Sequence, residues 1–324
     1  MSKVTKIKAE KPAIKKKAVK SASLPDETFS QGSSPEQGSS PDQGSSPEQG
    51  SSPEEKGSDL TIVGAGLPSA ILGTSQLSGE SMCVVIPYRK EPAAGDELRY
   101  ALRSWAKNFP GVSIVVIGDK EDWFSPLVGH IQAKALSDNP QIDVASKLLI
   151  AIGSDLIPDR FILSNDDIFV VTPLHIADLE VLTCNGKLPV AAPVPNSLYA
   201  VNKKRTVDAL LAEKLPIWDY STHTPFIFEK DKLAEVIAAH RADQQGQLVS
   251  SLYFNTYYPS VVPLRVDPGK NGSYMCCVHR SDPDREVLKL ALRTRKFVNV
   301  NNAGLKAVLP HLKEMFPDKS PFEK

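Results

Sequence analysis

Two adjacent carboxylates, Asp166 and Asp167, stand inside the stretch 160–171, where an apolar run is followed by Asn-Asp-Asp and then by apolar residues again. With Pro158 before it and Pro173 after it, this pattern predicts an interior strand of a mixed sheet that delivers both acids to its end. Ligands usually collect outside the carboxyl ends of such strands. Adjacent carboxylates stay ionised in a partly dry pocket only when a cation or strong donors compensate them, so the pair indicates a divalent metal that holds a phosphate. The competing interpretation is an Asn-Asp turn with solvated acids.

A lone histidine, His223, is the second group suited to chemistry. It is bracketed by Thr222 and Thr224 and fixed by Pro225 ahead of a predicted helix at 231–240. An unperturbed imidazole has a pKa of about 6.5, which makes it a natural general base for a sugar hydroxyl at neutral pH. The competing interpretation is a structural histidine that only exchanges hydrogen bonds, and the local pattern leaves both open.

The elements that must position these residues alternate along the chain. We expect strands at 82–89 and 112–119, a helix at 96–107, a short apolar piece at 129–131 and a helix at 143–152, all ahead of the Asn-Asp-Asp strand. This alternation predicts an α/β fold with a mixed, mostly parallel sheet and flanking helices, a nucleotide-sugar-transferase (GT-A-like) architecture, and it favours such a transferase over a hydrolase. Later elements are expected as a loop over the site at 188–201, helices at 204–214, 231–240 and 303–316, and a strand at 297–302.

The start of the chain has a different composition. Basic and acidic side chains balance, with Lys+Arg 38 and Asp+Glu 38, so there is no global attraction to nucleic acid or membrane. Lysines nevertheless gather in 1–23, and 31–54 repeats Gln-Gly-Ser-Ser-Pro-Glu/Asp without an aromatic or branched aliphatic side chain to bury. We therefore predict a disordered Lys-rich arm and repeat linker at 1–57, a connector at 58–80 and a catalytic domain at 81–324. The arm is either a weak tether to nucleic acid or an anionic surface, or a solubilising tail.

Several special sites and locations are disfavoured. The partial glycine fingerprint at Gly64 and Gly66 has Pro68 inside its turn and lacks the third glycine, which is more typical of a connector than of a dinucleotide site. The cysteines form no Cys-x-x-Cys pair, so neither a disulfide scaffold nor a zinc knuckle is indicated. No apolar run reaches the roughly 20 residues of a membrane span, and the Lys-rich start has no apolar core like that of a signal peptide. We expect a soluble protein in the reducing cytoplasm.

Three stretches, taken in order, resemble the Stealth family, which includes bacterial capsule polymerases and the eukaryotic lysosomal-enzyme N-acetylglucosamine-1-phosphotransferase. The first runs from Asp-Glu-Leu-Arg-Tyr-Ala-Leu-Arg-Ser at 96–104 to Asn-Asp-Asp-Ile-Phe at 165–169. The second is His-Thr-Pro to Lys at 223–230, and the third runs from Lys-Phe-Val-Asn-Val-Asn-Asn at 296–302 to Ser-Pro-Phe-Glu at 320–323. The resemblance implies transfer of a sugar 1-phosphate from a nucleotide diphosphosugar to an acceptor hydroxyl, such as that of a glycan, with release of a nucleoside monophosphate.

The resemblance also implies roles for individual residues. Asp166 and Asp167 would hold Mg²⁺ or Mn²⁺ or orient the acceptor, and His223 would deprotonate the acceptor hydroxyl. Cations around the diphosphate would offset the charge that spreads over the phosphate oxygens in the transition state. Arg99 and Arg103, four apart on one helical face, are candidates for a bidentate phosphate clamp, and a solvated face is their alternative. The remaining expected substrate-binding residues are Arg89, Ser146, Asn165, Arg295, Asn301 and Asn302.

The sequence departs from the family pattern at three places. The first strand ends Ile-Pro-Tyr-Arg at 86–89, where acidic and aromatic nucleotide-binding residues are usual, so the donor base is open and Arg89 is a substitute contact. Ala145 precedes Ser146 where the family has Asn-Ser, and Asn302 stands where an Asp is common, which weakens a metal role for that position.

Two other functions compete with sugar-phosphate transfer. One is a GT-A-type glycosyltransferase that moves the sugar itself, to a modified nucleic acid base reached through the Lys-rich arm or to another bacterial or phage acceptor. It would release a nucleoside diphosphate instead of a monophosphate. The other is a catalytically silent module that binds a nucleotide sugar or a glycan, against which the combination of His223, the acid pair and the arginines argues.

Overall fold

The computed structural model describes residues 82–91, 95–190, 197–266 and 274–324. All of them belong to the second of the chain's two units, Gly64–Lys324. The predictions for the Lys-rich arm, the repeat linker, the connector and the partial glycine fingerprint lie outside the described residues.

The main sheet has five strands in the order β3-β2-β1-β4-β7. Its strands are β1 (Cys83–Tyr88), β2 (Ser113–Gly118), β3 (Val128–Gln132), β4 (Arg160–Leu163) and β7 (Phe226–Glu229). The first four are parallel and β7 runs antiparallel to β4. Because side chains alternate along a strand, Val85 packs in one hydrophobic cluster and Val84 in another, and both are fully buried. The predicted mixed, mostly parallel α/β sheet with flanking helices is confirmed.

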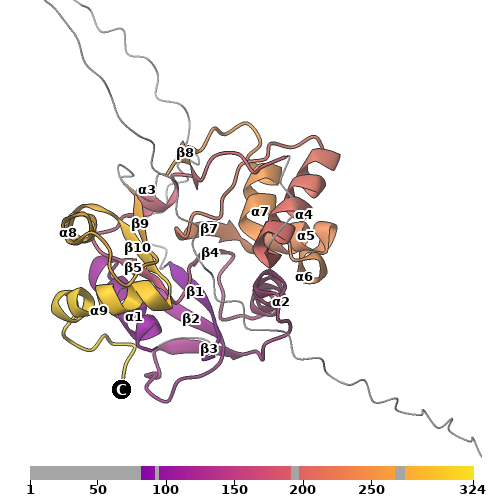
Figure 1. The fold of residues 1–324 in the computed structure, drawn as a ribbon. Helices are drawn as coiled ribbons and strands as arrows, with labels where there is room; N and C mark the ends of the chain where they lie inside the picture. Colours follow the sequence, from indigo (N-terminus) through magenta and orange to yellow (C-terminus); the bar gives the residue numbers. More distant parts are fainter. Residues whose placement is uncertain (1–81, 92–94, 191–196, 267–273) are drawn as a thin grey trace, which may run out of the picture. The chain divides into compact units, whose positions relative to one another are not determined.

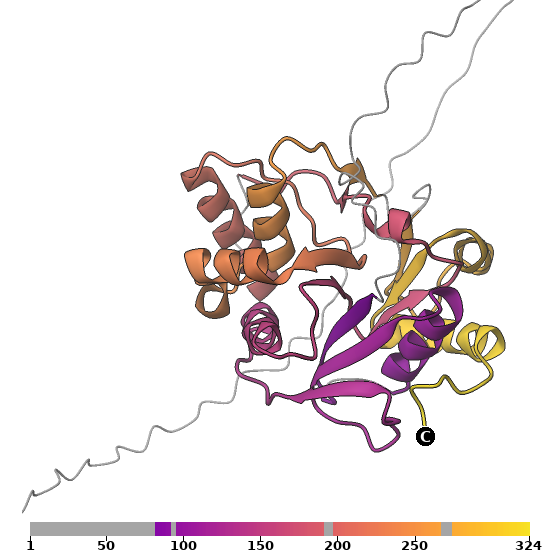
Figure 2. The ribbon, with the colours of Figure 1, turned by 180° about the vertical axis from the view of Figure 1, so that it is seen from behind.

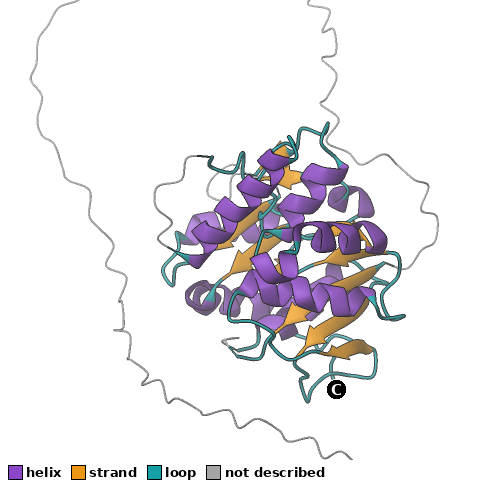
Figure 3. Cartoon of the chain, turned by 90° about the vertical axis from the view of Figure 1, so that its right-hand side faces the viewer, coloured by secondary structure: helices purple, strands orange, loops and turns teal. Residues whose placement is uncertain are grey.

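Most helices gather on one side of this sheet, at the right of Figure 1 and at the left of the reverse view in Figure 2. They are α2 (Pro140–Ile152), α4 (Leu198–Ala212), α5 (Lys230–His240), α6 (Ala242–Gln245) and α7 (Val249–Tyr257). Their buried side chains form one cluster with residues of β1, β2, β4 and β7. The layering of helices and strands is seen from the side in Figure 3.

A second, three-stranded sheet lies on the other side, in the order β5-β10-β9. Its strands are β5 (Ile168–Val170), β9 (Met275–Val278) and β10 (Phe297–Val300), and it is packed by α8 (Arg285–Thr294) and α9 (Asn302–Met315). The helix α1 (Glu97–Asn108) joins the two sheets, because Leu102 and Trp105 pack in the main-sheet cluster while Ala101 packs in the cluster of the small sheet. At the start of α9, a Cβ on Gly304 would lie 1.6 Å from the carbonyl oxygen of Val278, so this close approach requires glycine.

The remaining elements are short. They are α3 (Ile176–Leu179), β6 (Thr183–Cys184) and β8 (Leu264–Arg265), of which β6 and β8 pair in parallel. No helix of the described ranges is long and apolar enough to cross a membrane. The four cysteines are free thiols.

The Asn-Asp-Asp stretch corrects the prediction of one continuous strand across 160–171. β4 and β5 belong to different sheets and are joined by residues 164–167. The β4 part is an interior strand between parallel β1 and antiparallel β7, as predicted. The polar residues end it because carboxylates cannot be desolvated inside a ladder without partners, and the chain then turns into the second sheet.

Boundaries elsewhere were predicted with mixed success. The helices at 96–107, 231–240 and 303–316 are confirmed to within about a residue at each end, as α1, α5 and α9. The predicted loop at 188–201 is partly wrong, because α4 begins at Leu198, where Ser197 caps it by accepting a hydrogen bond from the Ala200 amide. The sequence analysis placed no element at β9, α7 or α8.

Candidate active site

The strand order reverses direction between β1 and β4. From β1 the chain passes through α1 to β2 and β3 on one side, whereas β4 lies on the other side of β1. Loops that leave the carboxyl ends of two such strands diverge and open a crevice, which is where ligands bind in open α/β sheets. Here β1 ends with Pro87 and Tyr88 and is followed by Arg89, and the loop after β4 carries Ser164 to Asp167.

A cavity of about 290 Å³, the acid pocket, occupies this crevice. It is lined by Pro87, Tyr88, Arg89, Glu97, Pro140, Asp143, Val144, Lys147, Asp166, Asp167, Val300, Asn301 and Asn302. Six of these side chains are ionisable acids or bases of the Asp, Glu, Lys and Arg types, so the pocket suits a charged ligand. The structure therefore brings five predicted site residues to one place: Arg89, Asp166, Asp167, Asn301 and Asn302.

The two carboxyl groups of the acid pair lie partly buried. Burial, then the neighbouring Asp167, raises the pKa of Asp166 to about 7, against a smaller opposing effect of Lys147. Burial likewise raises the pKa of Asp167 to about 6, although Asn299 and His279 act in the opposite direction. In this environment both ionised carboxylates are costly unless a cation joins them.

One carboxylate oxygen of the pair lacks a partner within the described part of the chain. The Oδ1 atom of Asp167 is buried and has no hydrogen-bond partner among the described residues. No cluster of three or more His, Cys, Asp or Glu side chains suited to a metal occurs in the described part of the chain. Mg²⁺ is commonly held by one or two carboxylates together with substrate phosphates, so Asp166 and Asp167 fit it without a third acid.

Lys147 is a site residue that the sequence analysis did not select. It is 1% exposed, its Nζ donates to the Tyr88 carbonyl at 3.1 Å, and it pairs with Asp143 at 2.9 Å. Gly118, with φ of 133°, makes room: a Cβ there would lie 1.9 Å from the Tyr88 carbonyl oxygen and 3.4 Å from the lysine Nζ. The available signal was an Asp and a Lys four residues apart on the apolar face of a predicted helix, where charged side chains are rarely buried without a function or a partner.

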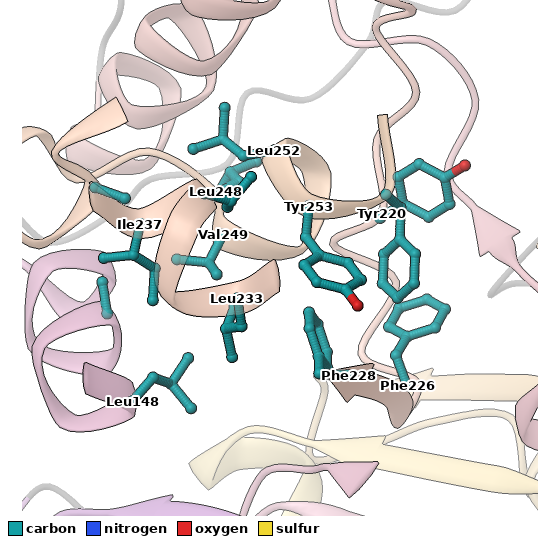
Figure 4. Packing of buried hydrophobic residues seen from close by; sticks show 14 of the residues in the cluster. Leu148, Tyr220, Phe226, Phe228, Leu233, Ile237, Leu248, Val249, Leu252 and Tyr253 are labelled. Carbon is teal, nitrogen blue, oxygen red and sulfur yellow. The ribbon is translucent and has the colours of Figure 1, made fainter. Parts of the chain in front are cut away.

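A second cavity of about 170 Å³, the histidine pocket, shares Val144 with the acid pocket. It is lined by Gln141, Val144, Leu148, Leu163, Ser164, Asn165, Ile168, Tyr199, Tyr220, Ser221, His223, Thr224, Phe226, Phe228, Leu248, Val249 and Ser250. Figure 4 shows apolar residues that line it, with Tyr220, Phe226 and Phe228 grouped on one side of the view and Leu148 and Val249 on the other. None of these lining residues is Asp, Glu, Lys or Arg. Asn165 therefore faces this pocket, one residue away from the acids.

His223 is held in an unusual backbone conformation. Its φ is 53°, in the left-handed region that non-glycine residues seldom adopt. The flanking Thr222 and Thr224 hydroxyls bond each other at 2.6 Å, and Thr224 also bonds Thr183 at 2.9 Å. These hydrogen bonds between buried threonine hydroxyls hold the main chain on both sides of His223. Removal from bulk water in the pocket, then the neighbouring His279, lowers the pKa of His223 below its ordinary value, which keeps the imidazole neutral and able to accept a proton.

The rim of the histidine pocket carries Tyr199, whose side chain is 43% exposed. Its hydroxyl donates to Ser221 Oγ at 2.8 Å, and Ser221 in turn donates to Asp219. Asp219 pairs with Lys203 at 2.8 Å, and the Lys203 ammonium lies 4.8 Å from the Tyr199 ring centroid. These contacts fix the orientation of the partly exposed ring at the pocket.

Other predicted site residues have structural partners. Asn301 caps α9, because its Oδ1 accepts from the Gly304 amide at 2.8 Å, and its Nδ2 donates to the His279 carbonyl at 3.3 Å. Asn302 is exposed at the rim of the acid pocket. Ser146, on α2, is partly buried and lines neither pocket.

The expected phosphate clamp of Arg99 and Arg103 is not found at the acid pocket. Both guanidinium groups bind Glu323 instead, Arg99 at 3.0 Å and Arg103 at 2.8 Å. Burial alone would raise the pKa of Glu323, but hydrogen bonds from Arg103, Ser320 and Arg99 outweigh it and lower the pKa to about 2. These two arginines hold the C-terminal segment against α1, and the sequence could not show that because their partner lies more than 200 residues away.

Arg295 is also placed away from the acid pocket. It precedes β10, whereas the pocket residues Val300 and Asn301 stand at the other end of that strand. At about 3.3 Å per extended residue, the strand separates Arg295 from the pocket by well over a hydrogen-bonding distance. The cations that the structure does bring to the acid pocket are Arg89 and Lys147.

Comparison with known proteins gives a fold resemblance only. No family model matches the chain, and no curated protein matches it either, so membership of the Stealth family stays a prediction. The solved structures that it resembles include two glycosyltransferases and a synthase. One is the galactosyltransferase LgtC in complex with donor and acceptor sugar analogs, with 11% identity over 74% of this chain and 96% of that chain and a TM-score of 0.41. Another is a glycosyltransferase involved in glycosylation of the major capsid of PBCV-1, with 10% identity over 72% of this chain and 100% of that chain and a TM-score of 0.38. The third is a 4-diphosphocytidyl-2C-methyl-D-erythritol synthase, with 16% identity over 58% of this chain and 88% of that chain and a TM-score of 0.35. Likenesses this distant say nothing about the reaction or the ligands of this chain.

Proposed function

We propose that the chain is a metal-dependent transferase that moves a sugar 1-phosphate from a nucleotide diphosphosugar to an acceptor hydroxyl. The observation that carries this proposal is the acid pair with an orphaned, buried carboxylate oxygen at the sheet's switch point, next to an uncharged pocket that contains His223. The acid pocket has the charges that a diphosphate and its cation need, and the histidine pocket has the hydroxyl, amide and aromatic groups that suit a glycan.

The donor belongs in the acid pocket on electrostatic grounds. Asp166 and Asp167 would hold Mg²⁺ or Mn²⁺, which when bound neutralises charge on the diphosphate oxygens. Arg89 and the buried Lys147 both line the pocket, and the Lys147 ammonium donates to the Tyr88 carbonyl. The guanidinium group of Arg89 is planar and can donate two parallel hydrogen bonds, so it suits two oxygens of a terminal phosphate. The buried ammonium of Lys147 supplies a fixed positive charge.

The acceptor belongs in the histidine pocket. His223 would take the proton from the acceptor hydroxyl as that oxygen forms a bond to the sugar-linked phosphorus. The bond from this phosphorus to the bridging oxygen breaks, and the nucleoside monophosphate leaves with the bridging oxygen. A neutral imidazole is required at the start, and the lowered pKa of His223 supports that state at neutral pH.

The test is to incubate the purified full chain with a panel of uridine, guanosine and cytidine diphosphosugars, Mg²⁺ or Mn²⁺, and a set of oligosaccharide acceptors, and to identify the released nucleotide by mass. Nucleoside monophosphate in the presence of metal is expected. Nucleoside diphosphate would instead establish the glycosyltransferase alternative, and donor binding without any release would establish the binding module. A GT-A-like classification, a cytoplasmic location and a contact of the Lys-rich arm with nucleic acid or an anionic surface remain predictions.

A further inference from the structure

A second histidine, His279, stands next to the site without lining either pocket. It follows β9 directly, and its ring centroid lies 6.3 Å from that of His223 with an interplanar angle of 80°. Its side chain reaches a buried amide, Asn299 of β10, which is 1% exposed. The Nε2 atom of His279 lies 3.1 Å from Asn299 Oδ1, and Asn299 Nδ2 lies 3.3 Å from the main-chain oxygen of Asp167.

The chemistry of these contacts sets the direction of each hydrogen bond. A main-chain carbonyl can only accept, so the Asn299 group that faces Asp167 must be the amide NH₂. The Oδ1 atom therefore faces His279 and accepts, which requires a proton on Nε2 of the imidazole. This tautomer leaves Nδ1 as the nitrogen with a free lone pair, and no described residue makes a hydrogen bond to it.

The contact matters because Asp167 joins the two sheets. Its carbonyl accepts from Asn299 and also from the Val300 amide at 3.2 Å, so β10 fixes the main chain from which the carboxylate projects into the acid pocket. Without His279 the buried Oδ1 atom of Asn299 would lose the donor that it faces. The amide would then be held less firmly in the orientation in which its NH₂ group donates to the Asp167 carbonyl, which loosens the loop between β4 and β5.

We propose that His279 is a positioning residue that, through Asn299, holds the Asp167 carboxylate in place for its cation and the donor diphosphate. The consequence for turnover rests on the proposed function, whereas the clamp itself does not. Groups that hydrogen-bond to a metal-ligating residue and orient it typically contribute about 10–100-fold in metal affinity or activity. Because the contact between His279 and Asn299 is only partly buried and acts through the main chain of Asp167, we expect an effect of about tenfold.

Four variants of the full chain test the clamp. His279→Ala removes the donor to Asn299, whereas His279→Gln carries an amide nitrogen that can occupy the place of Nε2. Asn299→Asp keeps the acceptor for His279 but loses the donor to Asp167. His311→Gln, on α9 and away from both pockets, is the matched control. We expect His279→Ala and Asn299→Asp to weaken Mn²⁺ binding and to lower kcat about tenfold, while His279→Gln recovers most of both.

Two readouts are independent of catalysis. Calorimetric titration with Mn²⁺ alone reports on the carboxylates, and long-range ¹H–¹⁵N spectra of histidine-labelled protein report the tautomer, with the His279 signals identified by their loss in His279→Gln. The Nε2–H form is expected. An Nδ1–H form, or unchanged Mn²⁺ affinity in His279→Ala, would overturn the proposal, and so would a His279→Gln variant as poor as His279→Ala. If the wild-type chain releases no nucleoside monophosphate, the proposed function fails while these two readouts still decide the clamp.

Discussion

The acid pocket and the histidine pocket share a wall at Val144 but differ sharply in charge. The first is lined by carboxylates, an arginine and a buried lysine, and the second by hydroxyl, amide and aromatic groups around one neutral histidine. Asn165 and Asp166 are neighbours in sequence and face different pockets. One short loop after β4 thus contributes to both a charged and an uncharged pocket. In the function that we propose, this loop would separate a diphosphate donor from an alcohol acceptor.

The strongest way to break this division is Asp167→Asn. The substitution keeps the side-chain shape and removes one carboxylate from the cation site, so we expect metal-dependent transfer to fall about 10³-fold because charge stabilisation in the transition state is lost. The control is Asp208→Asn, an acid 58% exposed on α4 whose loss should leave transfer unchanged. Wild-type turnover by Asp167→Asn with unaltered metal dependence would remove the acid pocket from the reaction.

His223→Ala acts on the other side of the division. We expect transfer to slow by about 10²-fold, the low end for general-base catalysis, because a loose phosphoryl-transfer transition state asks little of the base. Donor affinity, measured by calorimetry, should not change because the donor lies in the acid pocket. A variant that folds but no longer binds the donor would show that the two ligands are not separated as we describe.

The raised pKa of Asp166 also predicts how the stability of the metal-free protein depends on pH. The pKa of a free Asp carboxyl is 3.8, whereas folding raises that of Asp166 to about 7, so between these values the folded state binds more protons than the unfolded state. The metal-free protein should therefore lose stability as the pH rises from about 4 to about 7. At pH 8 the free energy of unfolding of metal-free Asp166→Asn should exceed that of wild type by about 1–3 kcal/mol, so the variant should unfold at a higher temperature, although we expect it to be inactive.

The matching measurement is thermal unfolding against pH, with and without Mg²⁺. Mg²⁺ should stabilise wild type and not Asp166→Asn, since only the wild-type pair binds it. Equal pH dependence in the two proteins would mean that the carboxyl group of Asp166 is solvated and that the pair does not store this unfavourable energy.

Tyr199→Ala gives the smallest expected effect and the sharpest test of the histidine pocket. Loss of the fixed ring should raise the KM for a glycan acceptor about tenfold, because one good aromatic contact contributes roughly the free energy that corresponds to a tenfold change in affinity. The KM for the donor should stay unchanged. Tyr199→Phe keeps the ring and loses only the hydrogen bond to Ser221, so it should stay close to wild type. An effect on the donor KM instead would place the donor next to Tyr199.

Much of this fold could be predicted because its signals are local. The β-branched run at β1 and the periodic apolar face of α1 need no distant partner to be recognised. The split of the Asn-Asp-Asp stretch into β4 and β5 could not be predicted, because β5 is a strand only through its pairing with β10, about 130 residues later. Isolated short strands carry no period of their own.

Prediction of the site residues was limited for the same reason. Asp166, Asp167 and His223 were found from residue type and spacing, and the structure places them on either side of one wall. Lys147 was missed because its function depends on contact with the Tyr88 carbonyl from another strand. Arg99 and Arg103 were assigned to phosphate because Glu323, the carboxylate that neutralises them, lies at the far end of the chain. In each case the missing information was a charge partner distant in sequence.

The most direct test of the two-pocket account is a crystal structure of the full chain with Mn²⁺ and the donor identified by nucleotide release, recorded at the manganese absorption edge. We predict an anomalous peak about 2.1–2.2 Å from oxygens of Asp166 and Asp167, with the donor diphosphate between it and Arg89, and no donor atoms beside Tyr199. Manganese bound elsewhere, or a diphosphate seated against His223 and Tyr199, would contradict the assignment of the two pockets.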